Sequence, residues 1–182
     1  METNVVDRRS EQVISPWVTL VTHSLQLPGW KKSEDYHSLQ QADYVALFTV
    51  TAEGRIPLVR QYRSALGCYT LELPSGLLEK GEDPKETGVR ELFEETGFVA
   101  GPEVQLMGRL AADTGRLENY QWAFFTNGAT RRPDQTWVSE AQVENLLVTK
   151  DELKQLILKG EFNHCPHLAV IALALVRGLF SF

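Results

Sequence analysis

The sequence predicts a mixed α/β domain, and three observations carry this prediction. Short segments rich in β-branched and aromatic residues occur between residues 17 and 73, one strongly capped helix follows them, and two further helical segments close the chain. With 182 residues, of which 43% are hydrophobic, the chain has the length of one domain and enough apolar side chains for a sizeable core. The pattern of the first forty residues indicates a separate small sheet.

The predicted strands lie on both sides of the central helix. Alternating apolar and polar residues, bounded by turn-forming residues, indicate strands at 17–27, 44–50, 56–62, 69–73, 103–109 and 120–126. A partner strand for the first of these is expected between Trp30 and Leu39. The polar residues 1–14 are expected to form a loose arm, and the polar residues 127–136 a loop.

The central helix is the most clearly marked element. Asp83 is a suitable N-cap, Pro84 occupies the first helical position, where a missing N–H costs nothing, and Glu86 completes a capping box. Gly97 suits the left-handed residue that ends a helix, so residues 84–96 are predicted to be helical. Further helices are expected at 151–159 and at 166–180, the second of them apolar nearly all round and therefore buried.

Charge and composition exclude several classes of protein. A net charge of −6 argues against a general binder of nucleic acids or anionic membranes. The 2 cysteines form no CxxC pair, so neither a disulfide framework nor a cysteine zinc site is expected, and a reducing compartment fits best. The N-terminus lacks a signal-peptide pattern, and the longest apolar run, 168–176, is too short to span a bilayer. A cytoplasmic location is therefore expected.

A cluster of carboxylates distinguishes the central helix. Glu91, Glu94 and Glu95 are three and four residues apart, so their side chains lie on one helix face. The loop from Gly76 to Gly81 lets backbone carbonyls approach the same point. Because Mg²⁺ prefers carboxylate and carbonyl oxygens, this pattern favours a cation site for polyphosphate chemistry over the alternative of a solvated acidic face. None of the 4 histidines shows a spacing that indicates a metal site.

Residues 76–98 resemble the Nudix box. That box consists of a glycine, a glutamate six positions later and, eight positions further on, the segment Arg-Glu-apolar-x-Glu-Glu-x-Gly-apolar. The matching residues here are Gly76, Glu82, Arg90, Glu91, Leu92, Glu94, Glu95, Gly97 and Phe98. All nine positions fit, so the chain is identified as a member of the Nudix hydrolase family. The resemblance implies an α/β/α sandwich, with a mixed sheet between helices, preceded here by a small N-terminal β segment.

The resemblance also implies roles for the box residues. Glu91 and Glu95 match the metal-binding glutamates, Glu94 matches a third, and Ser75 would offer its backbone carbonyl to a metal. The implied cofactor is Mg²⁺, with Mn²⁺ as the alternative, which neutralises a diphosphate and lowers the pKa of the attacking water. The residues expected to brace the loop against the helix are Gly76, Glu82 and Arg90.

The general base of related pyrophosphatases is a glutamate outside the box. The segment 137–145 offers Glu140, whose place suits a loop tip, and Glu144, which directly precedes a short apolar strand. We favour Glu140 as the catalytic base, and the alternative is that each of the two is only a surface acid. Glu94 is a further catalytic candidate, acting through a second ion or a water.

The segment upstream of the box resembles the branch of ADP-ribose and nucleotide-sugar pyrophosphatases. Gln-Tyr-Arg at 61–63 precedes Glu-Leu-Pro-Ser-Gly at 72–76, where that branch has Gln-Tyr-Arg before Glu-Leu-Pro-Ala-Gly. The resemblance implies that Arg63 contacts the diphosphate, as suits a guanidinium fork, and that Glu72 lies near the metals. Thr114 replaces the proline of the ADP-ribose group, which argues against strict ADP-ribose specificity. The downstream substrate-binding candidates are Arg116 and Glu118.

Binding of the nucleobase is assigned to aromatic residues near the N-terminus. In related pyrophosphatases this segment exchanges between two subunits, and its aromatic rings stack on the base. Trp17, Trp30 and Tyr36 are the candidates, with a place in the core or in a dimer interface as the alternative. The expected organisation is a dimer-exchanging β segment, residues 1–41, followed by the Nudix hydrolase domain, residues 42–182.

The sequence thus predicts an Mg²⁺-dependent pyrophosphohydrolase of nucleoside diphosphate sugars, ADP-ribose among them, with a nucleoside monophosphate and a sugar phosphate as products. A narrower GDP-mannose-type hydrolase is the alternative among enzymes. A non-catalytic module that senses a nucleotide sugar is the alternative outside them, and the complete set of box glutamates argues against it. The expected partners are the small-molecule substrate and a second copy of the chain in a homodimer, without nucleic acid or membrane.

Overall fold

The computed structural model describes residues 5–27, 29–132, 137 and 143–182 of the chain. These residues form two compact units. Unit 1 comprises residues 1–43 together with 111–120, and unit 2 comprises residues 44–110 and 121–182. The expected N-terminal segment, 1–41, did not include the residues of 111–120.

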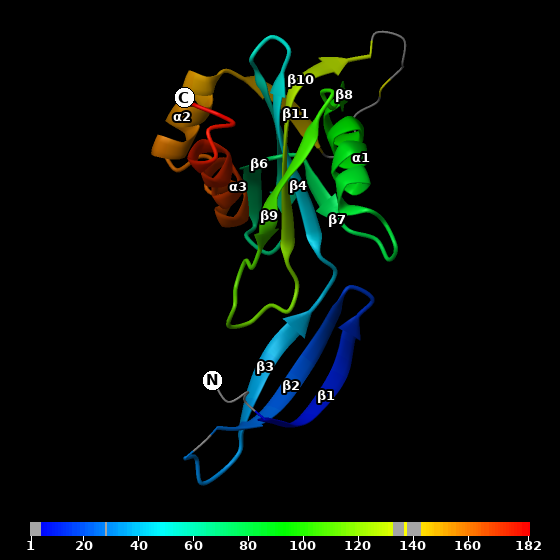
Figure 1. Cartoon of the computed structure of the whole chain (residues 1–182), viewed down its shortest axis with the longest axis vertical. Helices are drawn as coiled ribbons and strands as arrows, with labels where there is room; N and C mark the ends of the chain where they lie inside the picture. Colours follow the sequence, from blue (N-terminus) through cyan, green and yellow to red (C-terminus); the bar gives the residue numbers. More distant parts are fainter. Residues whose placement is uncertain (1–4, 28, 133–136, 138–142) are drawn as a thin grey trace. The chain divides into compact units, whose positions relative to one another are not determined.

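Unit 1 is a three-stranded antiparallel sheet in the order β1 (Val5–Ser15), β2 (Val18–Gln26) and β3 (Glu34–Gln40), shown in Figure 1. The prediction of a loose arm over residues 1–14 is wrong from Val5 onward, because these residues pair with β2. Residues 8–14 are all exposed, so no alternation of apolar and polar side chains marks the strand in the sequence. Strand β1 is therefore defined by its backbone pairing with β2.

The segment 111–120 adds to unit 1 along β3. Leu39 donates its N–H to the carbonyl of Arg116 at 2.7 Å and accepts the N–H of Glu118 at 3.0 Å. The side chain of Asn119 donates to the carbonyl of Ala42 at 3.0 Å. These bonds make the segment a short parallel neighbour of β3, which explains why its contacts assign it to unit 1.

Unit 2 is built on two sheets. The larger, mixed sheet has the order β7 (Ser75–Leu77), β4 (Tyr44–Thr51), β10 (Gln121–Arg131) and β8 (Phe98–Val99), and β9 (Val104–Leu110) also pairs with β10. In it β4 and β10 are parallel. The smaller, antiparallel sheet has the order β11 (Glu144–Val148), β5 (Ile56–Arg63) and β6 (Cys68–Glu72). The predicted loop at 127–136 is wrong over 127–131, because β10 continues through these residues and pairs with β8.

The predicted central helix is confirmed as α1 (Pro84–Thr96). Asp83 accepts the N–H groups of Lys85 and Glu86 at 2.9 and 3.2 Å, and Gly97 ends the helix with φ at 72°. The other helices are α2 (Lys150–Leu158) and α3 (Cys165–Val176).

The structure differs from the sequence prediction at α3. The helix ends at Val176 and not at residue 180, because Gly178 takes a left-handed conformation with φ at 67°. It is also not buried all round, since Val176 is 85% exposed. Among the described residues, none of the helices combines the length and apolar character needed to cross a bilayer.

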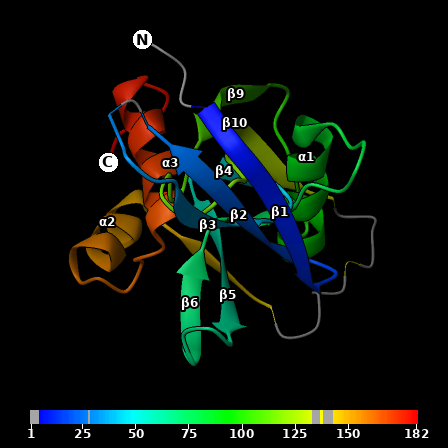
Figure 2. The ribbon, with the colours of Figure 1, turned by 90° about the horizontal axis from the view of Figure 1, so that it is seen from below.

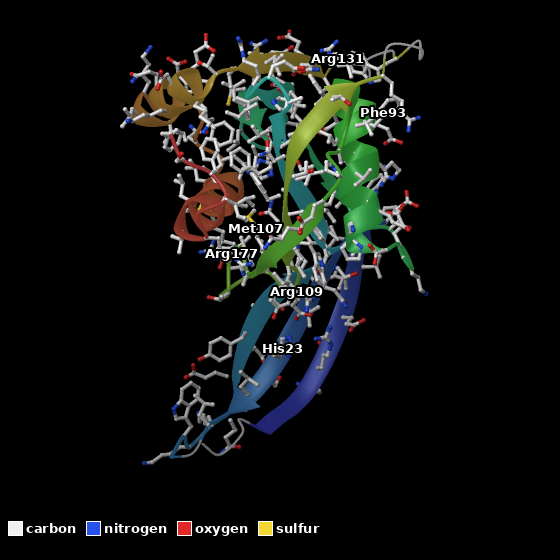
Figure 3. The ribbon with its side chains drawn as sticks, turned by 45° about the horizontal axis from the view of Figure 1, so that its top comes forward. His23, Phe93, Met107, Arg109, Arg131 and Arg177 are labelled. Carbon is white, nitrogen blue, oxygen red and sulfur yellow. The ribbon has the colours of Figure 1, made fainter. Side chains whose placement is uncertain are left out.

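The helices cover opposite faces of the larger sheet, as Figures 1 and 2 show. Alternate residues of β4 enter two separate cores: Val45 and Leu47 pack with Leu92 of α1, whereas Phe48 packs with Ile171 of α3. Met107 of β9 lies in the second core, and is labelled in Figure 3. This arrangement confirms the predicted α/β/α sandwich for unit 2.

Candidate active site

The box carboxylates meet the backbone of β7 at the surface of α1. The N–H of Ser75 donates to Oε2 of Glu95 at 2.9 Å, and Glu95 is only 4% exposed. Gly76 lies so close to Glu91 that an added Cβ would stand 2.0 Å from Oε1 of that carboxylate. Two consecutive residues of β7, Ser75 and Gly76, therefore approach two of the three clustered glutamates.

Arg90 links the carboxylates to the loop before the helix. Its Nη1 lies 2.9 Å from Oε1 of Glu91 and 2.8 Å from Oε2 of Glu94, and its Nη2 lies 3.4 Å from Oε2 of Glu82. Burial opposes the charge of Arg90, but the three carboxylates outweigh burial and raise the pKa of Arg90. Glu82 also accepts the hydroxyl of Thr87 at 2.9 Å, which lowers the pKa of Glu82. These contacts join the loop to α1.

The chemistry of this group fits a hard divalent cation. Glu82, Glu91 and Glu94 share the single guanidinium of Arg90, and Glu95 adds a fourth carboxylate beside Ser75, so the group keeps an excess of negative charge. The side chains of these four glutamates offer carboxylate oxygens, which are among the ligands that Mg²⁺ prefers. A Cβ at position 76 would collide with the carboxylate of Glu91, so a glycine is needed there for the backbone to lie against that carboxylate.

A buried ion pair flanks the box carboxylates. Arg63 of β5 donates from Nε and Nη2 to the two oxygens of Glu72 at 2.7 and 2.6 Å, and Thr70 donates to Glu72 at 2.7 Å. Burial of Glu72 opposes its charge, but these hydrogen bonds lower the pKa of Glu72 to about 2. The bond to Glu72 raises the pKa of Arg63, and Glu95 adds to this effect. The Arg63 side chain is 42% exposed, so part of the guanidinium remains accessible near the box.

Two histidines complete this side of the site, His164 at the N-cap of α3 and His167 in its first turn. No spacing in the sequence indicates them, because Glu72 lies far from both along the chain. Within the described part of the chain, one ligand atom from each of Glu72, His164 and His167 lies within 4.8 Å of the others, a spacing compatible with a metal ion. The two imidazole rings are in contact, with their centroids 4.0 Å apart and their planes tilted by 51°. Burial lowers the pKa of both rings, that of His167 to about 3.

Two contacts argue against a cation at this histidine group. The fully buried Leu73 donates its N–H to Nδ1 of His167 at 3.1 Å. Coordination through Nδ1 would take the lone pair that accepts this N–H, and coordination through Nε2 would place the ring proton on Nδ1, facing the same N–H. Either choice leaves a buried donor unpaired, and the guanidinium of Arg63 on Glu72 adds a positive charge. The box carboxylates are therefore the better candidate for a metal.

The two candidate bases have different positions. Glu144 is the first residue of β11, and its carboxylate lies 2.9 Å from Nη1 of Arg60 on the neighbouring strand. Glu140 lies outside the described residues. Trp137, which precedes it, donates its indole N–H to the carbonyl of Glu94 at 3.0 Å, so the start of this segment is attached to the end of α1.

The substrate-binding candidates of unit 1 have contacts within that unit. Glu118 accepts hydrogen bonds from His23 at 2.8 Å, from Ser38 at 2.5 Å and from Arg9 at 3.2 Å. Burial opposes its charge, but these donors lower the pKa of Glu118 to about 2. Arg116 is exposed, and its carbonyl is held by Leu39. In this structure Glu118 thus joins three strands to the 111–120 segment.

The two tryptophan candidates lie at opposite ends of β2. Trp17 directly precedes the strand and is 69% exposed, whereas Trp30 follows it and donates its N–H to the carbonyl of Leu27 at 3.0 Å. Nine extended residues separate them by about 30 Å. The rings of one chain therefore cannot enclose the same nucleobase.

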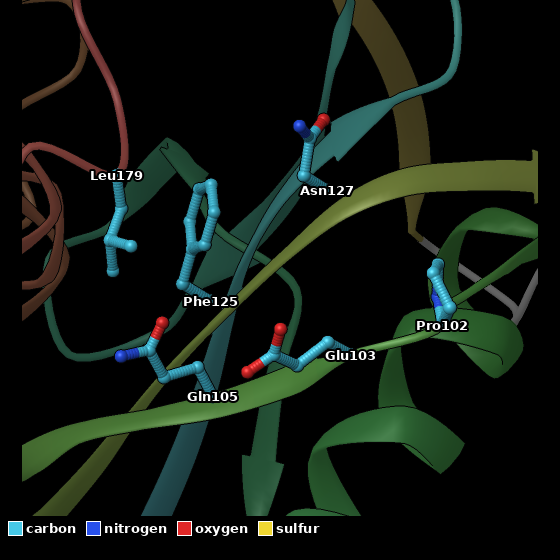
Figure 4. Close-up of a pocket in the computed structure, with 6 residues that line it drawn as sticks. All are labelled: Pro102, Glu103, Gln105, Phe125, Asn127 and Leu179. Carbon is cyan, nitrogen blue, oxygen red and sulfur yellow. The ribbon is translucent and has the colours of Figure 1, made fainter.

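A shallow groove of about 220 Å³ lies elsewhere in unit 2, along β9 and β10. Figure 4 shows the residues that line it, which are Pro102, Glu103, Gln105, Phe125, Asn127 and Leu179. None of the box residues lines this groove, so it does not belong to the candidate active site.

Comparison with known proteins agrees with this geometry. The model of the NUDIX domain family matches residues 40–167. The chain is 30% identical over 151 residues to the methanol dehydrogenase activator of Bacillus methanolicus, covering 82% of this chain and 80% of that protein. It is 42% identical over 91 residues to the ADP-ribose pyrophosphatase of Bacillus subtilis, which is 50% of this chain and 49% of that enzyme.

A solved structure extends the likeness to the whole fold. The crystal structure of an ADP compounds hydrolase superposes with a TM-score of 0.81 at 17% identity, over 98% of this chain and 95% of that one. The chain belongs to the NUDIX domain family. Its complete box and its ADP-ribose pyrophosphatase relatives make it a hydrolase.

Proposed function

We propose that the protein is an Mg²⁺-dependent pyrophosphohydrolase of nucleoside diphosphate sugars, including ADP-ribose. One observation carries the proposal: an accessible guanidinium, Arg63, lies near a group of clustered carboxylates that the backbone of β7 approaches. A diphosphate needs both of these features, because a cation must neutralise the phosphates and a guanidinium fork can bind their non-bridging oxygens. The similarity to an ADP-ribose pyrophosphatase supports the same substrate class.

The residues of the site divide the work of hydrolysis among them. Glu91, Glu95 and Glu94, together with the carbonyl of Ser75, would hold Mg²⁺ or Mn²⁺, which supplies charge neutralisation and a more acidic water. Arg63 orients the diphosphate, and Glu72 holds the guanidinium of Arg63 in one orientation. The water oxygen forms a bond to phosphorus while the anhydride P–O bond breaks, giving a nucleoside monophosphate and a sugar phosphate.

The proton of the attacking water needs an acceptor, and we propose Glu140 for this role. Glu144, the other candidate, already pairs with Arg60 across β11 and β5. That ion pair favours a structural task for Glu144, in joining the edge strand to its neighbour. Positioned general bases contribute typically about 10²–10⁴-fold to a rate, so the assignment has a measurable consequence.

The test is hydrolysis of a nucleotide panel in the presence of Mg²⁺, with the released monophosphates detected after phosphatase treatment. The panel contains ADP-ribose, ADP-glucose, GDP-mannose, UDP-glucose, NADH, a diadenosine polyphosphate and 8-oxo-dGTP. Glu95→Gln keeps an oxygen that can accept the Ser75 N–H but removes the charge. Glu86→Gln, on the exposed first turn of the same helix, is the matched control.

Turnover of several sugar diphosphates that disappears in Glu95→Gln and persists in Glu86→Gln would support the proposal. Turnover of GDP-mannose alone would favour the narrower nucleotide-sugar hydrolase. Activity only on the dinucleotide or the triphosphate would refute the substrate class. These outcomes separate the chemistry of the box from the choice of substrate.

A regulatory module is the second candidate, because one relative is named as the activator of a dehydrogenase. Tight binding of a nucleotide sugar without turnover would favour it. The complete box argues for catalysis, since a sensor has no need of three carboxylates around one arginine.

We also propose a cytoplasmic homodimer in which the aromatic residues of unit 1 serve the base. Trp17 supports this proposal, because a large apolar side chain that is 69% exposed is suited to a contact with another molecule. Sedimentation equilibrium of the full chain and of Trp17→Ser tests the dimer. A monomeric wild-type protein would refute it.

A further inference from the structure

We propose that His167 is a positioning residue of the active site, acting through the backbone of Leu73. This inference rests on the proposed function, because it concerns how the site for the diphosphate is held in shape. His167 belongs to the first turn of α3, about ninety residues after the segment that it contacts. Neither the Nudix box nor the residues upstream of it include this helix.

The segment that His167 contacts connects the two halves of the site. Glu72, which orients Arg63, ends β6, and Ser75, whose N–H meets Glu95, begins β7. Only Leu73 and Pro74 lie between them. A small rotation of this dipeptide would therefore move the ion pair and the β7 backbone relative to each other.

Each backbone group in this connection needs its own partner, because the strand pairing stops at Glu72 and resumes at Ser75. The carbonyl of Pro74 accepts the N–H of Leu47 at 3.0 Å, and Pro74 has no N–H to satisfy. The N–H of Leu73 is donated to Nδ1 of His167 at 3.1 Å. A side chain from a distant helix thus supplies the acceptor that a strand would otherwise provide.

The surroundings of His167 hold the ring in the form that this contact requires. Nδ1 can accept an N–H only when it carries no proton, so the ring must be neutral with its proton on Nε2. The side chain is 2% exposed, and the tilted ring of His164 lies against it with the two centroids 4.0 Å apart. The charged groups that face it are Glu72 and Arg63, which neutralise each other as an ion pair.

Paired substitutions separate this role from simple packing. His167→Asn places an amide oxygen near the position of Nδ1 and keeps an acceptor for Leu73, whereas His167→Leu fills similar space without one. Val170→Ala, one turn further along α3 in the same core, is the control for loosening of the helix. Turnover of the best nucleotide sugar and Mn²⁺ affinity from electron paramagnetic resonance are measured for all four full-length proteins.

We expect His167→Leu to lose about tenfold or more in kcat and in Mn²⁺ affinity, His167→Asn to stay within about threefold of wild type, and Val170→Ala to match it. Equal losses in both His167 variants would overturn the proposal, as would an equal loss in Val170→Ala or no loss in His167→Leu. If wild type hydrolyses no nucleotide sugar, the proposed function fails. The Mn²⁺ affinities and the ¹⁵N signals of the His167 ring, which report whether Nδ1 is unprotonated, then still decide the positioning role.

Discussion

Replacing Gly76 with alanine should lower the catalytic rate by about 10²-fold while leaving the fold nearly unchanged. The backbone of Gly76 is not left-handed, so alanine introduces no backbone strain. The added Cβ would stand 2.0 Å from Oε1, 2.2 Å from Cδ and 2.7 Å from Cγ of Glu91. Because the end of that side chain is flexible, Glu91 can rotate away, and the carboxylate must then leave its place among the box residues.

The expected magnitudes follow from this single displacement. A side chain forced from its preferred rotamer costs about 0.5–1.5 kcal/mol, and about 1 kcal/mol lowers the Tm of a protein of this size by about 2–4 °C. A displacement of a positioning group by about 1 Å can reduce a rate by about 10²-fold. Gly76→Ala should therefore lose activity and Mg²⁺ affinity far out of proportion to its loss of stability.

Calorimetry, kcat with a nucleotide sugar and Mn²⁺ titration test this expectation. Gly88→Ala is the matched control, since its Cβ would lie 3.1 Å from Cγ1 of Val45 in the apolar core beneath α1. This control should alter Tm and leave kcat and metal affinity unchanged. Full activity in Gly76→Ala would refute the assignment of Glu91 to the metal, and an unfolded Gly76→Ala would refute the assumption that Glu91 can move.

Four further predictions concern the ion pairs and the base. Glu72→Gln should lower the free energy of unfolding, measured in urea, by about 3 kcal/mol. This is the lower end of the range for buried ion pairs, because Arg63 is partly exposed. A loss below about 1 kcal/mol would contradict a stabilising role of the pair. The pKa of Glu72 is lowered from 4.5 to about 2, so the stabilising contribution of its carboxylate is complete above pH 4.5 and is lost as the pH falls toward 2. Glu72→Gln should therefore flatten the dependence of the unfolding free energy on pH over this range. Glu118→Gln should speed hydrogen exchange at the amide of Leu39. Unchanged protection of that amide would contradict this prediction. Glu140→Gln should lower kcat by about 10²-fold or more while Glu144→Gln keeps it, and the reverse order would move the base to Glu144.

Local signals in the sequence were sufficient to predict the elements whose causes are local. The helix 84–96 follows from Asp83, Pro84 and Gly97, which act on their own neighbours. The face shared by the box glutamates follows from the helical repeat. Both could be predicted because their physical causes lie within a few residues of their effects.

The sequence patterns failed where pairing or exposure replaced local signals. Strand β1 carries no apolar alternation over residues 8–14, because both of its faces are exposed there. The apolar character of the segment 166–180 also predicted a longer and fully buried helix, whereas α3 ends at Val176 and the core of unit 2 covers only one of its sides.

The distant residues that complete the site are brought together by tertiary packing. It brings the buried Glu72 together with Arg63 across two strands, and it brings His167 of α3 to the N–H of Leu73. It also assigns Glu118 to the sheet of unit 1, where three donors hold it. These contacts satisfy buried charges and buried N–H groups, and any distant segment of suitable chemistry can supply the partner. For that reason no spacing in the sequence encodes them, and the packing of the elements selects them.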